Sequence, residues 1–218
     1  DPEHRLYASD LAGGGILEVG CYPVSMSRLI AGAASGKPFL APVQIQGSAH
    51  LGQSGVDEWA AALLTFPNDI IAEVSCSVSL AQDNVLRILG TKGRIEVADF
   101  WFAGGKQGGT GEIRIVRADG SVELVEVAES GWLYSFEVDA AGEAIRAGWQ
   151  QLASPGMSWA DTLGNLRTLD KWRASVGLVF DIEKASRKTT TIKGAKLVRG
   201  PKSIPKRQLP GVSQPTSV

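Results

Sequence analysis

The two side chains with the clearest capacity for chemistry are Glu18 and Tyr22, which follow three consecutive glycines at 13–15. Glycines lack a Cβ, so they leave open space into which a carboxylate and a phenol just behind them can project. A phenol acts as a general acid or base if a nearby cation lowers its pKa from about 10. The structural alternative is that Tyr22 packs at a helix start with its hydroxyl group hydrogen-bonded.

Cys21 lies next to Tyr22, and the only other cysteine is Cys76. Each cysteine stands in an apolar stretch, without a cysteine or histidine partner at metal-site spacing. We predict buried, reduced thiols and no bound metal. His4 and His50 are far apart in the sequence, and we interpret both as surface or structural residues.

Two glycine-rich segments resemble phosphate-binding loops but lack their defining features. Residues 32–38, GAASGKP, have three residues between the glycines and a proline after the lysine, whereas a P-loop has four and then Ser or Thr. Segment 104–111, GGKQGGTG, lies between two expected strands, with no helix N-terminus to bind a phosphate. No G-x-G-x-x-G motif follows a first strand, so we predict no cofactor-binding residues in this sequence.

A turn at 13–15 and a helix after it are the elements that position Glu18 and Tyr22. Pro23 fits the first turn of a helix, where its missing N–H is not needed. The periodicity up to residue 32 gives this helix two sides. One side carries Val24, Arg28 and Ala31, and we expect the other, with Met26, Leu29 and Ile30, to face a core.

Strand-like segments follow this helix. In residues 72–79, Ala, Val, Cys and Val alternate with Glu and three serines, which predicts a sheet with one covered face. Short turns at 67–69, 90–93 and 119–120 favour antiparallel hairpins between consecutive strands. The expected strand-like segments are 42–51, 59–67, 70–80, 85–97 and 112–127.

Two helical segments come after the strands, at 135–150 and 158–178, and Ser158 resembles the N-cap of the second. We expect these helices to pack on one face of the sheet. The predicted fold class is therefore α+β, with an open-faced, mainly antiparallel β-sheet and helices packed on one face. We assign this domain to residues 1–183 and a basic linker to residues 184–218.

The net charge of −1 hides an asymmetry, because nine of the 22 basic residues and none of the 23 acidic ones lie from Lys184 onward. This tail lacks interleaved aromatics and helical periodicity, so we predict a solvated linker and no nucleic-acid partner. No run reaches the roughly 18 apolar residues of a membrane helix, and the first ten residues lack a signal-peptide pattern. We therefore expect a cytoplasmic protein without a membrane partner.

Four segments in order carry a family resemblance: residues 13–32, GGGILEVGCYPVSMSRLIAG, and then residues 55–67, 85–97 and 161–178. Together they resemble the C-terminal domain of the glucose-fructose oxidoreductase, inositol dehydrogenase and MocA (Gfo/Idh/MocA) family, in its tyrosine-type branch. The resemblance runs from residue 1 to residue 180. It implies an open-faced sheet through which the protein forms a homodimer or a higher homo-oligomer.

In that family a preceding Rossmann domain binds NAD or NADP and supplies a lysine near the substrate carbonyl. The resemblance implies that this sequence is the substrate-binding half of an NAD(P)-dependent oxidoreductase acting on a CH–OH group of a sugar, polyol or diol. It also implies that this half is inactive alone. Tyr22 takes the position of the catalytic proton donor or acceptor. Glu18, together with Gly14 and Gly15, is implied as substrate-binding, although Asp is commoner where Glu18 stands.

A second hypothesis is a non-catalytic dimerisation or binding module that keeps the sheet without the chemistry. Its motivation is the lack of a nucleotide motif and the presence of Glu18 in place of Asp. Residues 204–218, IPKRQLPGVSQPTSV, also resemble the opening hairpin of aldo-keto reductases. The tail is therefore either a linker alone or the start of a fused barrel domain.

Overall fold

The computed structural model describes residues 4–180 and 183–184, which form an α+β fold of the predicted class. Residues 185–218, with most of the predicted linker and the segment resembling aldo-keto reductases, lie outside the described part of the chain. None of the helices within the described ranges is long and apolar enough to cross a membrane. The helices are α1 (Gly15–Glu18), α2 (Cys21–Ala34), α3 (Ser135–Arg146) and α4 (Trp159–Ser175).

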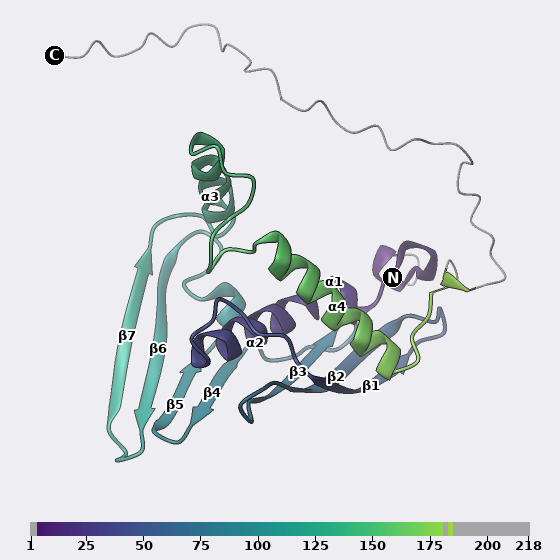
Figure 1. Cartoon of the computed structure of the whole chain (residues 1–218), viewed down its shortest axis with the longest axis horizontal. Helices are drawn as coiled ribbons and strands as arrows, with labels where there is room; N and C mark the ends of the chain where they lie inside the picture. Colours follow the sequence, from purple (N-terminus) through teal and green to yellow (C-terminus); the bar gives the residue numbers. More distant parts are fainter. Residues whose placement is uncertain (1–3, 181–182, 185–218) are drawn as a thin grey trace, which may run out of the picture. The chain divides into compact units, whose positions relative to one another are not determined.

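The strands of the described residues form two antiparallel sheets in which consecutive strands are neighbours (Figure 1). All of their pairings are antiparallel, which confirms the prediction made from the short turns. The first sheet contains β1 (Gln44–Leu51), β2 (Asp57–Thr65) and β3 (Ile71–Ser77). The second contains β4 (Leu86–Gly90), β5 (Gly93–Val97), β6 (Gly109–Arg117) and β7 (Val122–Glu129).

The break between the sheets lies directly after β3, where the sequence analysis placed one continuous sheet. The Ser77 hydroxyl group donates a hydrogen bond to the Glu58 carbonyl oxygen at 2.9 Å. The Ser77 hydroxyl oxygen in turn accepts hydrogen bonds from the backbone N–H groups of Ser79 and Leu80, at 3.0 and 2.7 Å. A side chain that satisfies nearby backbone groups in this way offers an alternative to the strand ladder. The chain therefore turns away and begins a second sheet at β4.

The hydrophobic core lies between the first sheet and the helices that cover one of its faces. Trp172 of α4, Ile16 of α1 and Leu64 of β2 are completely buried. Helix α4, which carries Trp172, packs on β1. Gly47 makes this contact possible, because a Cβ at that position would lie 2.7 Å from the Trp172 ring. The predicted N-cap of α4 is confirmed: the Ser158 hydroxyl oxygen accepts a hydrogen bond from the Asp161 N–H at 3.2 Å.

The buried side of α2 is the opposite of the one expected from its sequence. Val24, Arg28 and Ala31 are buried against the rest of the fold. The side predicted to face the core is only partly buried, so that prediction was wrong. The reason is that α2 packs on α4, whose Asp161 neutralises the Arg28 guanidinium group and allows it to be buried.

Helix α3 departs from the expectation that both late helices pack on the sheet. Figure 1 shows it standing beside the ends of β6 and β7, away from α4 and the first sheet. Its first turn reaches the second sheet, where Phe136 lines a cavity with Ile113 and Val127. Ala144 is its only buried residue, while Val138 and Ile145 are exposed. The helix therefore contributes much less to the core than α4 does.

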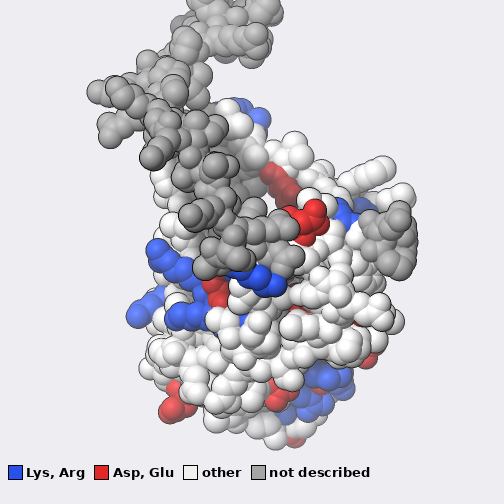
Figure 2. Space-filling view, turned by 90° about the vertical axis from the view of Figure 1, so that its right-hand side faces the viewer, with Lys and Arg blue, Asp and Glu red and all other residues white. Residues whose placement is uncertain are grey.

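The charged side chains of the described residues are mixed rather than segregated. Figure 2 shows small groups of basic and acidic side chains beside one another, with uncharged surface between them. Ion pairs account for part of this mixing, since Arg94 and Arg114 each contact Glu96 at 2.8 Å. The described part of this face therefore has no continuous basic patch of the kind that attracts nucleic acid.

Candidate functional site

A cavity of about 550 Å³ opens beside the first turn of α2, between β3 and the segments that lead into and out of the second sheet. Its lining combines aromatic and apolar side chains with polar ones, which is the usual composition of a small-molecule site. The aromatic and apolar residues include Val19, Tyr22, Leu80, Val85, Trp101, Phe102, Leu133 and Tyr134. The polar residues are Glu73, Ser75, Ser77, Gln82, Asp83, Asn84 and Glu137.

Tyr22 is the predicted site residue that the structure places in this cavity. It is the second residue of α2, its side chain is 56% exposed, and its ring centroid lies 5.5 Å from that of Trp101. No residue of the described part of the chain forms a hydrogen bond with its hydroxyl group. The phenol is therefore free to interact with a molecule in the cavity.

The surroundings of Tyr22 keep its phenol protonated. Burial of the ring is the largest cause that raises the Tyr22 pKa, and negative charge on Cys21, Tyr134, Glu137 and Glu18 adds to it. A protonated phenol donates a proton to a substrate oxygen. None of the described residues that line the cavity is basic, so the lining itself supplies no cation that would lower this pKa.

Glu18 forms an ion pair with Arg5 outside the cavity. The Arg5 guanidinium group binds both of its carboxylate oxygens, at 2.8 and 2.5 Å, and this hydrogen bonding is the largest cause that lowers the Glu18 pKa. Glu18 does not line the cavity. In this structure the carboxylate fixes the N-terminal turn on α1, and its predicted contact with a substrate hydroxyl remains a prediction.

Gly14 and Gly15, also predicted as substrate-binding, contact a buried carboxyl group instead of the cavity. Gly14 has a φ of +107°, and a Cβ there would lie 2.2 Å from Asp57 Oδ1. A Cβ on Gly15 would lie 3.4 Å from Asp57 Oδ2. The two glycines therefore admit the Asp57 side chain to the start of α1, where Oδ2 accepts a hydrogen bond from the Ile16 N–H at 2.6 Å.

Asp57 is the residue near the site that the sequence analysis missed. It is 1% exposed, and burial is the main cause that raises its pKa, partly offset by hydrogen bonds from the backbone of Ile16, Asp57 and Gly15. The available signal was an acidic residue directly after Val56, at the start of a largely apolar strand. Asp57 fixes α1, and α1 leads directly into the turn of α2 that carries Tyr22.

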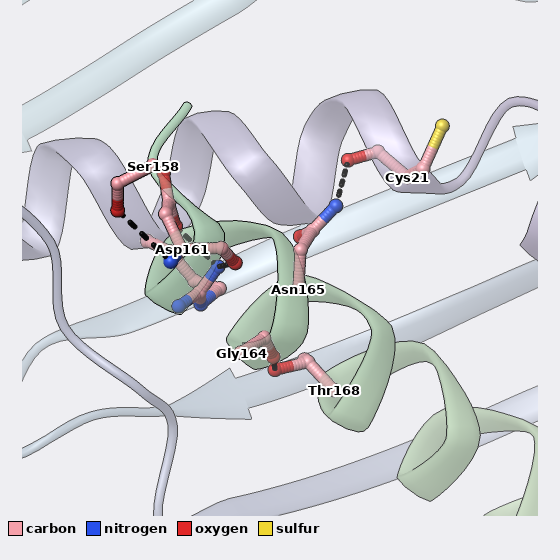
Figure 3. A network of polar contacts seen from close by, with 7 residues as sticks. Cys21, Ser158, Asp161, Gly164, Asn165 and Thr168 are labelled. Carbon is pink, nitrogen blue, oxygen red and sulfur yellow. Dashed lines mark hydrogen bonds and ion pairs between the residues drawn. The ribbon is translucent and has the colours of Figure 1, made fainter. Parts of the chain in front are cut away.

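A polar network holds α2 against α4 (Figure 3). Arg28, which is fully buried, donates hydrogen bonds to the Asp161 side chain at 2.6 Å and to its carbonyl oxygen at 2.8 Å. One helical turn further along α4, the Asn165 side chain donates to the carbonyl oxygen of Cys21 at 3.1 Å. The residue directly before Tyr22 is thus tied to the core of the fold.

The two thiols near the site are free, as predicted. Cys76 is buried, and burial raises its pKa to about 12, whereas Cys21 is only partly buried. The described residues contain no group of three His, Cys, Asp or Glu side chains arranged to hold a metal ion. The described chemistry of the cavity therefore comes from a phenol, carboxylates, amides and hydroxyl groups.

Comparison with known proteins shows which proteins this chain resembles. Residues 1–96 match the GFO/IDH/MocA C-terminal domain. Trans-1,2-dihydrobenzene-1,2-diol dehydrogenase from Mus musculus is 31% identical over 90 residues, covering 41% of this chain and 25% of that protein. The Homo sapiens enzyme of the same name is 24% identical over 178 residues, covering 79% of this chain and 49% of that protein.

Solved structures show the same fold. A 3-ketoreductase from Actinomadura kijaniata, in complex with NADP and TDP-benzene, superposes with a TM-score of 0.65 at 20% identity, over 81% of this chain and 50% of that one. An aldose-aldose oxidoreductase from Caulobacter crescentus, complexed with glycerol, gives a TM-score of 0.63 at 24% identity, with the same coverage. The chain thus spans about half the length of the human relative and of these two structures. Over residues 1–96 the chain is similar to the C-terminal domain of the Gfo/Idh/MocA family, and the two solved structures show the same fold over 81% of the chain.

Proposed function

We propose that this chain is the substrate-binding half of an NAD(P)-dependent oxidoreductase that acts on a CH–OH group of a sugar, polyol or diol. The observation that carries the proposal is the free phenol of Tyr22 in the wall of a cavity with aromatic and polar sides. The names of the similar proteins support it, since they describe a diol dehydrogenase, a 3-ketoreductase and an aldose oxidoreductase.

In this proposal Tyr22 exchanges a proton with the substrate oxygen. When a carbonyl is reduced, the protonated phenol donates its proton to the oxygen, and in the reverse direction the phenolate accepts a proton from the alcohol. The raised Tyr22 pKa favours the donor form. Trp101, packed beside the Tyr22 ring, limits where that ring can move. Asp57 and Asn165 act indirectly, because they hold the backbone on which Tyr22 is mounted.

The described residues do not fit a dinucleotide cofactor. A Rossmann site needs parallel strands joined by a helix whose N-terminus faces the pyrophosphate. Residues 4–180 contain only antiparallel strand pairs. The proposal therefore assigns the cofactor to a separate domain, and a nicotinamide bound there supplies or accepts the hydride. It follows that the present chain has no redox activity alone.

The test compares this 218-residue chain with a longer polypeptide that includes a cofactor domain. Calorimetry with NAD and NADP, together with assays of diol and sugar oxidation, should show binding and turnover only in the longer polypeptide. In that polypeptide we expect Tyr22→Phe to lower kcat by about 10²–10⁴-fold, the usual contribution of a general acid or base. Tyr7→Phe is the matched control, because Tyr7 does not line the cavity and its hydroxyl group donates to the Val78 carbonyl oxygen at 3.1 Å. If Tyr22→Phe leaves the turnover of every substrate unchanged, the proposed role of Tyr22 is wrong.

A non-catalytic module is the second candidate, and the ion pair between Arg5 and Glu18 favours it. That pair occupies a carboxylate that the family resemblance places at the substrate. An Arg5→Ala variant of the longer polypeptide separates the two functions. If Glu18 serves the substrate once it is released, KM changes; if no substrate is turned over by either form, the non-catalytic module is the better description.

We also propose that two copies of this chain associate through the uncovered face of the first sheet. This face has a shallow hollow lined by small and polar residues of β1, β2 and β3, with Leu63 exposed at its centre. No helix of the described residues covers this face. Sedimentation velocity should show a dimer at micromolar concentration that Leu63→Glu dissociates. A monomer in the unmodified protein would contradict the proposal.

A further inference from the structure

The charge of the cavity gives a more specific expectation about its ligand. Three carboxylates, those of Glu73, Asp83 and Glu137, lie in its lining. Among the described residues that line it, none is Lys, Arg or His. The basic side chain recorded beside the lining is Lys106, whose Nζ lies 4.8 Å from the Phe102 ring centroid and faces a separate hollow. The wall that this chain contributes is therefore negative.

The helix N-terminus at the cavity does not offset this charge. Anions bind helix N-termini through free backbone N–H groups. Here α2 follows α1 closely, and two of its first amides are already used: the N–H groups of Tyr22 and Val24 donate to the carbonyl oxygens of Val19 and Gly20, each at 3.2 Å. Pro23 has no N–H to offer. A phosphate in this cavity would therefore find no cation in the described lining, and the amides of Tyr22 and Val24 would not be free to bind it.

The remaining lining suits an uncharged, hydroxyl-rich molecule. Trp101, Tyr134 and Tyr22 present aromatic surface, against which the C–H face of a ring or chain can pack. Gln82 and Asn84 add amide groups that both donate and accept hydrogen bonds. Carboxylates accept hydrogen bonds from hydroxyl groups and repel anions, so the same side chains bind one class and exclude the other.

We infer that this site selects an uncharged diol, polyol or sugar and rejects phosphorylated and nucleotide-activated sugars, with Asp83 and Glu137 as residues that determine this specificity. The inference rests on the proposed function, since it concerns the substrate of the same cavity. Asp83 comes from the segment between the two sheets and Glu137 from the first turn of α3. The selectivity therefore arises from the two segments that approach Tyr22 from the side of the second sheet.

The test uses matched pairs of ligands that differ by one phosphate: glycerol with glycerol 3-phosphate, myo-inositol with its monophosphate, and glucose with glucose 6-phosphate. Turnover of each is measured as kcat/KM in the longer polypeptide with its cofactor domain, at low and at high salt. We expect the uncharged member of any accepted pair to be preferred at least tenfold at low salt. The preference should shrink as salt screens the carboxylates.

The variant Asp83→Asn/Glu137→Gln removes two negative charges from the cavity. Asp139→Asn/Glu143→Gln removes the same number from exposed positions of α3 that do not line it. The ratio of kcat/KM between the uncharged and the phosphorylated member should fall several-fold in the first variant and stay unchanged in the second. Phosphorylated ligands used as well as their uncharged partners, or a ratio unmoved by the cavity variant, would overturn the inference while leaving the oxidoreductase assignment intact. If no diol, polyol or sugar of either kind is turned over, the proposed function fails, and this inference fails with it.

Discussion

The two sheets of this molecule differ in how their surroundings stabilise them. The first sheet carries α2 and α4 on one face, and residues such as Leu64 and Trp172 are completely buried there. The second sheet has no comparable cover from a helix of the described residues, and α3 exposes Val138 and Ile145 to solvent. The free energy of unfolding therefore resides mainly in the first region. The second region buries fewer apolar side chains and contributes less to it.

The largest expected difference between the two regions concerns two tryptophans. Trp172→Ala removes a fully buried side chain that links α4 to β1, so we expect a loss of about 3–5 kcal/mol in the free energy of unfolding. Trp149→Ala, just beyond α3, removes a side chain that is 59% exposed, and should change it by no more than about 0.5 kcal/mol. Urea denaturation followed by circular dichroism measures both. Equal losses would show that the second region is as tightly packed as the first.

Breaking an ion pair should also destabilise the fold more in the first region than in the second. Asp161→Ala leaves the buried guanidinium group of Arg28 without its partner, and should destabilise the fold by about 3–5 kcal/mol. Glu123→Ala breaks the exposed pair with Arg117 in the second sheet and should cost no more than about 1 kcal/mol. The double change Arg28→Met/Asp161→Leu should recover most of the stability that Asp161→Ala loses. If the double variant does not recover this stability, the Arg28–Asp161 pair stabilises the fold by more than the neutralisation of two buried charges.

The smallest expected difference concerns the pH dependence of two carboxyl groups. Burial raises the Asp57 pKa, so the stability linked to this group is complete below its ordinary value of 3.8 and is lost as the pH rises through the raised value. Hydrogen bonds from Arg94 and Arg114 lower the Glu96 pKa, so its contribution is present above 4.5 and is lost as the pH falls through the lowered value.

Asp57→Asn should therefore become more stable relative to the unmodified protein as the pH rises from 4 to 7, by at most about 1.4 kcal/mol per pH unit. Glu96→Gln should become relatively less stable as the pH rises from low values to above 4.5. Urea unfolding at a series of pH values measures both trends. If the unfolding free energies of the two variants, relative to the unmodified protein, changed with pH in the same direction, the buried environment of Asp57 and the exposed environment of Glu96 would be contradicted.

The features that local sequence patterns determine were predicted well. The alternation of residues 72–79, the short turns and the Ser158 cap all act over a few residues, and the structure confirms the strands, the antiparallel pairing and the cap. The placement of Tyr22 in the first turn of a helix behind the glycines is likewise as expected. Its role in catalysis remains a proposal.

The features that depend on contacts distant in sequence could not be predicted. Arg28 is buried because Asp161, 133 residues later, neutralises it, and the helical pattern alone contains no trace of that partner. The close approach of Asp57 to Gly14 and the capture of Glu18 by Arg5 have the same origin. The first sheet ends where the Ser77 hydroxyl group bonds the Glu58 carbonyl oxygen and two backbone N–H groups, and the alternation of residues 72–79 does not reveal that end.

The hydrogen bond from Asn165 to the Cys21 carbonyl oxygen ties one end of the cavity to the core. The two ends of the cavity should therefore tolerate substitutions to different degrees. At one end, Tyr22 is mounted on backbone that α4 and Asp57 hold from two sides, so changes there disturb the core. At the other end, residues 80–85, 101–102 and 133–137 belong to connecting segments and to the exposed α3. Loop grafting at that second end should exchange one substrate range for another without resetting the reactive group, which makes these three segments the place to begin redesign.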